Sequence, residues 1–94
     1  MRRACIKGTG FYVPEQVVTN DDLAERMDTS DEWIRQRSGI ERRRYAPDDV
    51  GCAELAYRAS LRALGDAGLE RNAIDCIILA TLSPDYHFPG SACV

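Results

Sequence analysis

The sequence predicts an α/β protein with a mainly parallel sheet. Two observations carry this prediction: a continuous apolar run at residues 75–81 and a long amphipathic helical pattern at residues 52–67. A strand that is apolar on both sides needs cover on both faces, as in a parallel α/β sheet. The helices expected in 94 residues cannot supply that cover. We therefore expect this chain to be the N-terminal piece of a larger protein.

Composition places the chain among ordinary globular proteins. It has 45% hydrophobic residues, 29% charged residues and a net charge of −3, and its length suits one small domain. No apolar run approaches the roughly 20 residues of a membrane span. Residues 1–7 hold too short an apolar stretch for a signal peptide. A cytoplasmic protein without a membrane partner is expected.

Short elements are expected in the first half of the chain. Residues 4–9 have the pattern of a short strand, and Gly8 and Gly10 break it. This glycine pair is not a dinucleotide-binding loop, because Val13 stands where the third glycine would be. Asn20 is expected to cap a short helix. The remaining elements are extended or looping segments at 11–14 and 16–19, a helix at 21–27, and a strand or extended turn at 41–46.

The pattern at residues 52–67 predicts one amphipathic helix. Gly68 is expected to end it, with Leu69 placed for the apolar contact of a Schellman motif. Arg58 and Arg62 fall on the opposite, wetter side. Most of the buried stripe is alanine, so we expect a neighbouring segment to approach closely. The stripe is formed by Cys52, Leu55, Ala56, Ala59, Ala63 and Ala67.

The cysteines predict neither a metal site nor a disulfide framework. None of the four forms a Cys-x-x-Cys pair, and the single histidine, His87, has no partner at ligand spacing. Nothing indicates secretion, so all four are expected to be reduced. Cys5 and Cys76 fall in apolar strand-like runs, where a thiol acts as a small hydrophobe. The remaining two are Cys52 and Cys93.

Charge is segregated along the chain. Residues 21–32 are acidic, and five arginines follow between residues 35 and 44. One interpretation is a solvated helix and turn with local ion pairs, worth about 0–1 kcal/mol each. The other is a basic patch that faces an anionic ligand or an acidic protein. Nucleic acid is not an expected partner, because the whole chain is acidic and aromatic residues do not alternate with the arginines.

The segment at residues 28–40 predicts a helix of about two turns that holds the only tryptophan. Thr29 and Glu32 have the spacing of a capping box, and Gly39 is suited to end the helix. Trp33 and Arg37 are four residues apart and therefore share a face. An aromatic ring beside a guanidinium suits a nucleotide, by stacking on the base and pairing with phosphate. The alternative is a half-buried tryptophan covered by an arginine stem.

Five motifs occur in order along the chain: Gly8 to Glu15, Thr19-Asn20, Asp28 to Ile34, Arg37 to Ile40 and Phe88-Pro89. Together they resemble the N-terminus of β-ketoacyl-acyl carrier protein synthase III, a condensing enzyme with a thiolase fold. The Asp-Thr-Ser-Asp-Glu-Trp-Ile run is the most specific part of this resemblance. The resemblance covers the whole chain in one register and implies the N-terminal portion of one thiolase-like domain, with a layered α-β-α architecture that is incomplete here.

The resemblance also implies ligand roles for five residues. Trp33 and Arg37 match the pair that sandwiches the adenine of coenzyme A. Ser38 stands where this family usually has threonine, and Thr29 lies beside the same ligand. Phe88 matches a residue near the acyl pocket, which the family completes across a homodimer interface. Coenzyme A enters as the thioester substrate, so no tightly bound cofactor is expected.

The reaction implied is a condensation of an acyl-CoA primer with malonyl-acyl carrier protein, which starts fatty acid synthesis. Its catalytic cysteine, histidine and asparagine lie beyond residue 94, so we expect no catalytic residue in this chain. Cys93 resembles a structural cysteine, and His87 an exposed or interface loop residue. Two alternatives stay open: a secondary-metabolism condensing enzyme with a longer primer, and a non-catalytic module that binds a nucleotide or a protein partner.

Overall fold

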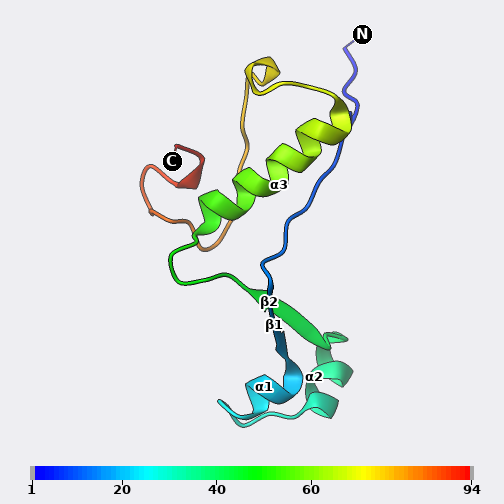
Figure 1. The fold of residues 1–94 in the computed structure, drawn as a ribbon, viewed down its shortest axis with the longest axis vertical. Coiled ribbons are helices and arrows are strands. Elements are labelled where there is room, and N and C mark those ends of the chain that lie inside the picture. The colour runs from blue at the N-terminus through cyan, green and yellow to red at the C-terminus, as the bar shows by residue number, and fades with distance from the viewer. Residues whose placement is uncertain (1, 94) are drawn as a thin grey trace. The chain divides into compact units, whose positions relative to one another are not determined.

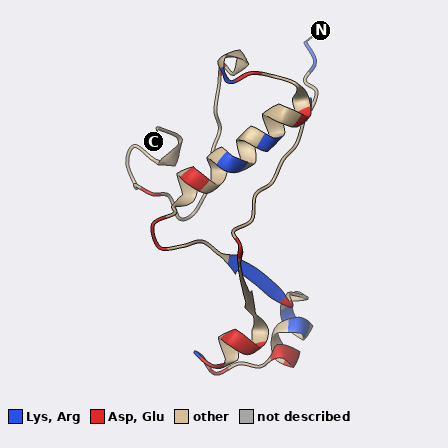
Figure 2. Cartoon of the chain, in the orientation of Figure 1, with Lys and Arg blue, Asp and Glu red and all other residues tan. Residues whose placement is uncertain are grey.

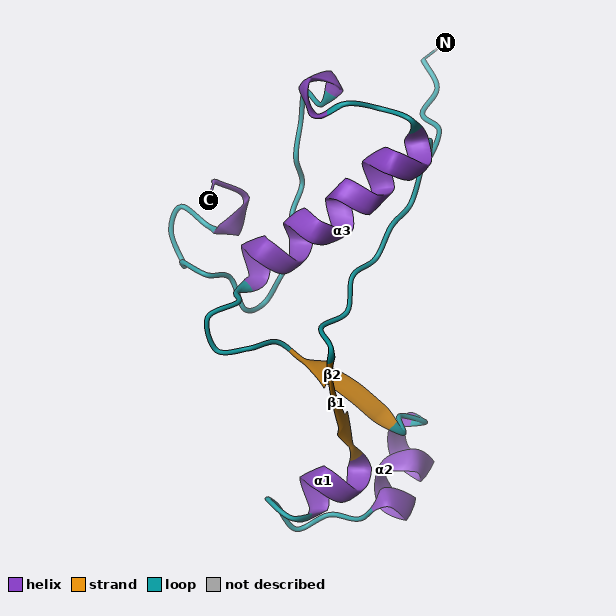
Figure 3. Ribbon diagram, viewed as in Figure 1, coloured by secondary structure: helices purple, strands orange, loops and turns teal. Residues whose placement is uncertain are grey.

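The computed structural model describes residues 2–93 and divides them into two compact units (Figure 1). The hairpin unit runs from Val13 to Pro47. The α3 unit comprises the described residues up to Tyr12 and those from Asp48 onward. In chain order, the elements are β1 (Gln16–Thr19), α1 (Asn20–Ala24), α2 (Asp31–Ser38), β2 (Arg42–Tyr45), α3 (Cys52–Ala67) and the 3₁₀ turns η1 (Arg71–Ala73) and η2 (Ser91–Cys93) (Figure 3).

The two strands of the hairpin unit form an antiparallel pair that encloses the two short helices in sequence. Val18 lies opposite Arg43, so the two side chains share one face of the pair. Val18 is buried, whereas the residues on either side of it are exposed. The strand expected at residues 41–46 is therefore confirmed, and the extended segment at 16–19 is its partner.

A buried asparagine links the elements of the hairpin unit. Asn20 is 1% exposed. Its Nδ2 donates to Asp31 Oδ1 and to the carbonyl oxygen of Ile40, both at 2.8 Å. Its Oδ1 accepts from Arg43 Nη2, also at 2.8 Å. The amide is thus satisfied by three partners, as a buried polar group must be.

The first helix begins one residue earlier than expected and ends sooner. Thr19, not Asn20, is its N-cap: the Thr19 hydroxyl accepts from the Asp22 amide at 3.2 Å, and the Asp22 carboxylate accepts from the Thr19 amide at 2.9 Å. These reciprocal bonds form a capping box. Asn20 is wrong as the cap because its side chain is committed to the core contacts described above. The helix stops at Ala24 rather than at Met27.

The long helix of the α3 unit has the predicted bounds. Gly68 follows it with a φ of 69°, and the Leu69 amide donates to the Leu64 carbonyl oxygen at 3.0 Å. That bond is the long-range bond of a Schellman motif, as the sequence predicted. The apolar stripe is half-buried and the arginine side is exposed.

The chain near Gly8 and Gly10 lies directly on the alanine stripe of α3. A Cβ at Gly8 would come within 2.7 Å of the Ala63 carbonyl oxygen and the Ala67 amide nitrogen. The segment is also tied by Arg58 Nη1, which donates to the Tyr12 hydroxyl at 2.6 Å. The expected close approach to the alanine stripe is therefore confirmed, and the glycines permit it.

The strands predicted at residues 4–9 and 75–81 are wrong for this structure. Both segments are extended, but neither forms a backbone–backbone hydrogen bond within the described residues. Ile78 is 92% exposed and Leu82 fully exposed. An apolar run becomes a strand only when a neighbouring strand satisfies its backbone. The helices and the small sheet make the chain an incomplete α/β fragment, as predicted.

Among residues 2–93, no helix is both long and apolar enough to span a bilayer.

Candidate functional site

The helix α2 presents the pair of residues that the sequence singled out. Its N-cap is Ser30, whose backbone is extended and whose Oγ accepts from the Trp33 amide at 3.1 Å. The predicted capping box of Thr29 with Glu32 is therefore wrong by one residue, because Ser30 takes the cap position first. Gly39 closes the helix with a φ of 74°, as predicted.

Trp33 and Arg37 lie together on one face of α2. The Arg37 Cζ atom is 5.4 Å from the centroid of the indole ring, which is within cation–π range. The tryptophan remains 55% exposed. The indole is thus held in a defined position by a guanidinium while much of its surface stays accessible to a ligand.

The two hydroxyl groups assigned to the same site differ in their availability. Ser38 Oγ donates to the Ile34 carbonyl oxygen at 2.9 Å and accepts from the Ile40 amide at 3.2 Å. Its proton is therefore used to end the helix. Thr29 Oγ1 is buried and has no hydrogen-bond partner within the described residues. Of the two, Thr29 has the unmet hydrogen-bonding capacity.

The basic segment of the hairpin unit lies on α2 and β2 (Figure 2), and local contacts occupy three of its five arginines. Arg35 pairs with Glu41 at 2.7 Å, and this hydrogen bond raises the pKa of the guanidinium further. Arg43 binds Asn20, and Arg44 Nη1 donates to the Pro14 carbonyl oxygen at 3.0 Å. Arg37 forms no ion pair within residues 2–93, and neither does Arg42. Of the two, Arg37 lies against the exposed indole of Trp33 and is the one placed to meet an anion beside that ring.

Phe88, in the α3 unit, is the other predicted site residue. Its side chain is 92% exposed. It belongs to a loop whose base is closed by a hydrogen bond of 2.7 Å from the Asp85 amide to Ser91 Oγ. The adjacent His87 is exposed, as expected for a loop residue.

The sequence analysis missed the residue that fastens this loop. Asp85 Oδ1 accepts from the Cys52 amide at 2.6 Å, and Oδ2 accepts from the Ala53 amide at 3.1 Å. The only local signal was Gly51, which supplies no side chain to cap a helix that begins at Cys52. The capping partner is 33 residues away, beyond the range of any capping pattern.

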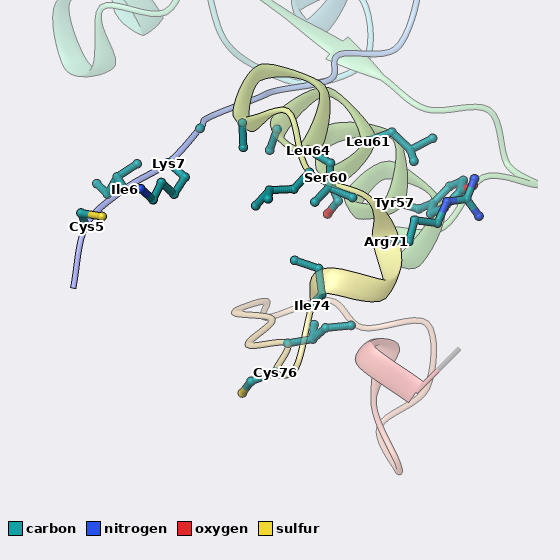
Figure 4. A pocket seen from close by; sticks show the side chains of 15 residues that line it. Cys5, Ile6, Lys7, Tyr57, Ser60, Leu61, Leu64, Arg71, Ile74 and Cys76 are labelled. Atoms are coloured by element: carbon teal, nitrogen blue, oxygen red, sulfur yellow. The ribbon is translucent and has the colours of Figure 1, made fainter. Parts of the chain in front are cut away.

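An apolar groove of about 560 Å³ lies along α3 (Figure 4). It is lined by residues 5–8, by Leu61 and Leu64 of α3, and by Ile74 and Ile77. No site was predicted here. The two extended segments that lack strand partners form its walls.

The four cysteines are free, as predicted. Cys5 and Cys76 line the groove, but they are exposed and lie outside any strand, so the expectation that they act as small hydrophobes in apolar strands is wrong. Within residues 2–93, no cluster of three or more histidine, cysteine or acidic side chains is arranged to hold a metal ion.

Comparison with known proteins gives consistent matches in sequence. No family model matches the chain. The β-ketoacyl-acyl-carrier-protein synthase III of Geobacillus kaustophilus is 57% identical over 91 residues, which are 97% of this chain and 29% of that protein. The protein of the same name from Paracoccus denitrificans is 52% identical over 92 residues, covering 98% of this chain and 28% of that protein. The chain therefore spans less than a third of these relatives.

Solved structures agree with the sequence matches. The 3-oxoacyl-acyl-carrier-protein synthase III of Aquifex aeolicus superposes with a TM-score of 0.84 at 48% identity, over 94% of this chain and 28% of that one. A priming β-ketosynthase from a polyketide pathway gives 0.85 at 33% identity, over 94% and 26%. The predicted thiolase-like class is thereby confirmed. Over nearly all of its residues, the chain is homologous to a segment of the β-ketoacyl-acyl-carrier-protein synthase III family, which confirms the resemblance that its motifs carry.

Proposed function

We propose that this chain supplies the adenine-binding helix of a condensing acyltransferase. The full-length protein would join an acyl-CoA primer to malonyl-acyl carrier protein and so start fatty acid synthesis. The observation that carries the proposal is the exposed indole of Trp33 with the Arg37 guanidinium 5.4 Å from its centroid. A ring held in this way offers a stacking surface for a base and a positive charge for a phosphate.

Two further features support coenzyme A as the ligand of this helix. The Thr29 hydroxyl has no partner among residues 2–93, so a polar group of a ligand that reaches it would satisfy it. Arg37 has no carboxylate partner in the described part of the chain, so its charge is free to meet a phosphate. Ser38 contributes less, because its proton already goes to Ile34.

In this proposal, the chain contributes to the binding of acyl-CoA and carries none of the catalytic residues. We propose that it is the N-terminal portion of one thiolase-like domain, and that the catalytic cysteine, histidine and asparagine belong to the rest of the protein. We further propose a cytoplasmic homodimer with residues 80–94 at or near its interface. Exposed Phe88 supports this, since a large apolar side chain gains by being covered. Light scattering that shows a monomer at micromolar concentration would contradict the dimer.

A second candidate is a condensing enzyme of secondary metabolism that accepts a longer primer. The similarity to the polyketide priming ketosynthase favours this alternative over a non-catalytic module. Phe88 forms only one wall of the proposed acyl pocket, so it does not set the primer length by itself. Activity measured across acyl-CoA chain lengths determines which primer the enzyme prefers.

The test is to replace Trp33 and Arg37 by alanine, one at a time, in the full-length protein. Loss of the stacking surface costs about 1–3 kcal/mol, and loss of the charged contact about 1.5–3 kcal/mol. Each corresponds to an acyl-CoA interaction weakened by about tenfold to hundredfold. The KM for malonyl-acyl carrier protein, which has no adenine, should change less.

Arg42→Ala is the matched control, because Arg42 is an exposed arginine of the same unit without an ion pair in the described residues. It should leave the KM for acyl-CoA unchanged. Thermal melts accompany each variant. If Trp33→Ala and Arg37→Ala lower the melting temperature but leave that KM unchanged, Trp33 only packs against its neighbours and the proposal is wrong.

A further inference from the structure

The helix α3 has no capping side chain of its own. Its N-cap is Gly51, which has extended backbone angles and no side-chain cap bond. The first amides of a helix lack intrahelical partners and attract a negative charge. In this chain the carboxylate of Asp85 meets two of them, Cys52 and Ala53, one with each oxygen.

Gly51 fits this contact by its small size. A Cβ at position 51 would collide with Oδ1 of Asp85 and would lie 2.9 Å from Cγ of the same side chain. The φ of Gly51 is −98°, which any residue can adopt. Glycine is therefore needed here for the close approach of the carboxylate and not for the backbone conformation.

The same aspartate closes the base of the loop that carries Phe88. Its amide donates to Ser91 Oγ at 2.7 Å, and Ser91 is buried. On the incoming side, Thr81 Oγ1 lies 3.5 Å from Cys52 Sγ and accepts from the Ser83 amide at 3.1 Å. The loop folds back to the start of α3 (Figure 1). The incoming limb of the loop is thus fastened to the first turn of α3, and the outgoing limb is fastened to Asp85 through Ser91.

We infer that Asp85 is a positioning residue that fixes Phe88 by anchoring its loop to the start of α3. The inference rests on the proposed function, in which Phe88 forms one wall of the acyl pocket. Asp85 itself touches neither substrate nor reacting atoms. It acts by keeping the loop in one arrangement, so the size of the pocket, and with it the preference among acyl primers, depends on this carboxylate.

Two variants of the full-length protein test the inference, one by changing the Asp85 carboxylate and the other by changing the residue that it approaches. Asp85→Asn keeps the shape but removes the charge and one of the two acceptor oxygens. Gly51→Ala keeps the carboxylate but blocks its approach. Asp49→Asn is the control, since Asp49 is an exposed acid of the segment before α3 that makes no hydrogen bond among the described residues.

The first readout is hydrogen exchange at the amides of Cys52, Ala53 and Asp85, which needs no activity. Loss of one charge-assisted bond should speed exchange at these amides by about fivefold in both test variants and not in the control. The second readout is the ratio of kcat/KM for a two-carbon and a six-carbon acyl-CoA. That ratio should change by about the same factor. The affinity for coenzyme A itself, which is the part common to both substrates, should stay constant.

Each result decides one part of the inference. Unchanged exchange in both variants overturns the anchor. Faster exchange with an unchanged primer ratio overturns the positioning role and leaves a purely structural cap. If the unmodified protein transfers no acyl group from any acyl-CoA, the proposed function and the positioning role fail together, and exchange alone still decides whether Asp85 anchors the loop.

Discussion

Gly10 lies directly against Ala63 of α3. A Cβ at position 10 would collide with the Ala63 amide nitrogen and would lie 2.8 Å from the Ala59 carbonyl oxygen. The chain rests on helix backbone that cannot move aside, in contrast to a contact with a flexible side chain. The alanines of α3 and the glycines that lie on it therefore form one close-packed contact.

Gly10→Ala should lower the free energy of unfolding of the full-length protein by about 1–3 kcal/mol, because the added methyl overpacks this contact. Gly65→Ala is the matched control: Gly65 lies within α3, and a Cβ there meets nothing within 4 Å. That change should stabilise by about 0.5–1 kcal/mol, since alanine favours the helix. Urea unfolding of both variants measures the difference. Equal effects would contradict the close contact.

Ser30→Ala should destabilise α2 by about 1 kcal/mol, because it removes the bond from the Trp33 amide to the cap hydroxyl. Thr29→Val should be neutral or stabilising by up to about 1 kcal/mol, because it replaces by a methyl a buried hydroxyl that has no partner in the described part of the chain. Thermal unfolding of the two variants compares the alternative caps. If Thr29→Val destabilised the protein more than Ser30→Ala, Thr29 would be the cap in place of Ser30.

Thr29→Val has a second use, because the same hydroxyl is a proposed ligand contact. If coenzyme A satisfies it, the variant should bind acyl-CoA more weakly while it unfolds no more easily. Isothermal titration at one temperature measures the first quantity. Unchanged affinity would remove Thr29 from the proposed site and leave Trp33 and Arg37 in it.

The capping box of α1 should make its stability depend on pH. Hydrogen bonds from the Thr19 amide, and then from its hydroxyl, lower the pKa of the Asp22 carboxyl. Because the folded pKa lies below the unfolded one, the stabilisation is fully present above about pH 4, the ordinary range of an aspartate. It is lost as pH falls through the folded pKa.

Asp22→Asn should therefore be less stable than the unmodified protein at pH 7, and the difference should shrink below about pH 4. Guanidinium unfolding at a series of pH values measures it. Asp21→Asn, which alters the neighbouring carboxylate outside the capping box, is the control. A decline of equal size in the control would assign the effect to general charge.

Residues 1–94 expressed alone should be aggregated or molten. Large apolar side chains such as Ile6, Ile78 and Leu82 are almost fully exposed, and each is worth about 1.5–3 kcal/mol when buried. Size-exclusion chromatography with a thermal melt tests this. A monomer with one sharp cooperative transition would contradict it, and it would show that the exposed side chains find cover within the chain.

The sequence predicted those features that depend on neighbouring residues. The bounds of α3, the Gly68 motif after it and the shared face of Trp33 and Arg37 follow from spacings of three to five residues. The caps of α1 and α2 were each misplaced by one position. Adjacent residues there, Thr19 with Asn20 and Thr29 with Ser30, are all good caps, and only their backbone angles and other contacts decide between them.

Features that depend on distant residues were not predictable from local patterns. An apolar run such as 75–81 shows that a segment is suited to burial, but it does not show what will pair with it. The contact of Asp85 with α3 joins residues 33 positions apart. No periodicity or capping spacing links such positions, so only the folded chain reveals the partner.

Asn20 has a consequence for how the strands of the hairpin unit align. Its amide has two different ends, and each meets its own kind of partner: acceptors at Asp31 and Ile40, and a donor at Arg43. A slip of β2 by one residue along β1 would turn Arg43 to the other face. The buried carbonyl end of Asn20 would then lose its donor. One asparagine thus makes misaligned pairings costly and selects the alignment that places Val18 opposite Arg43.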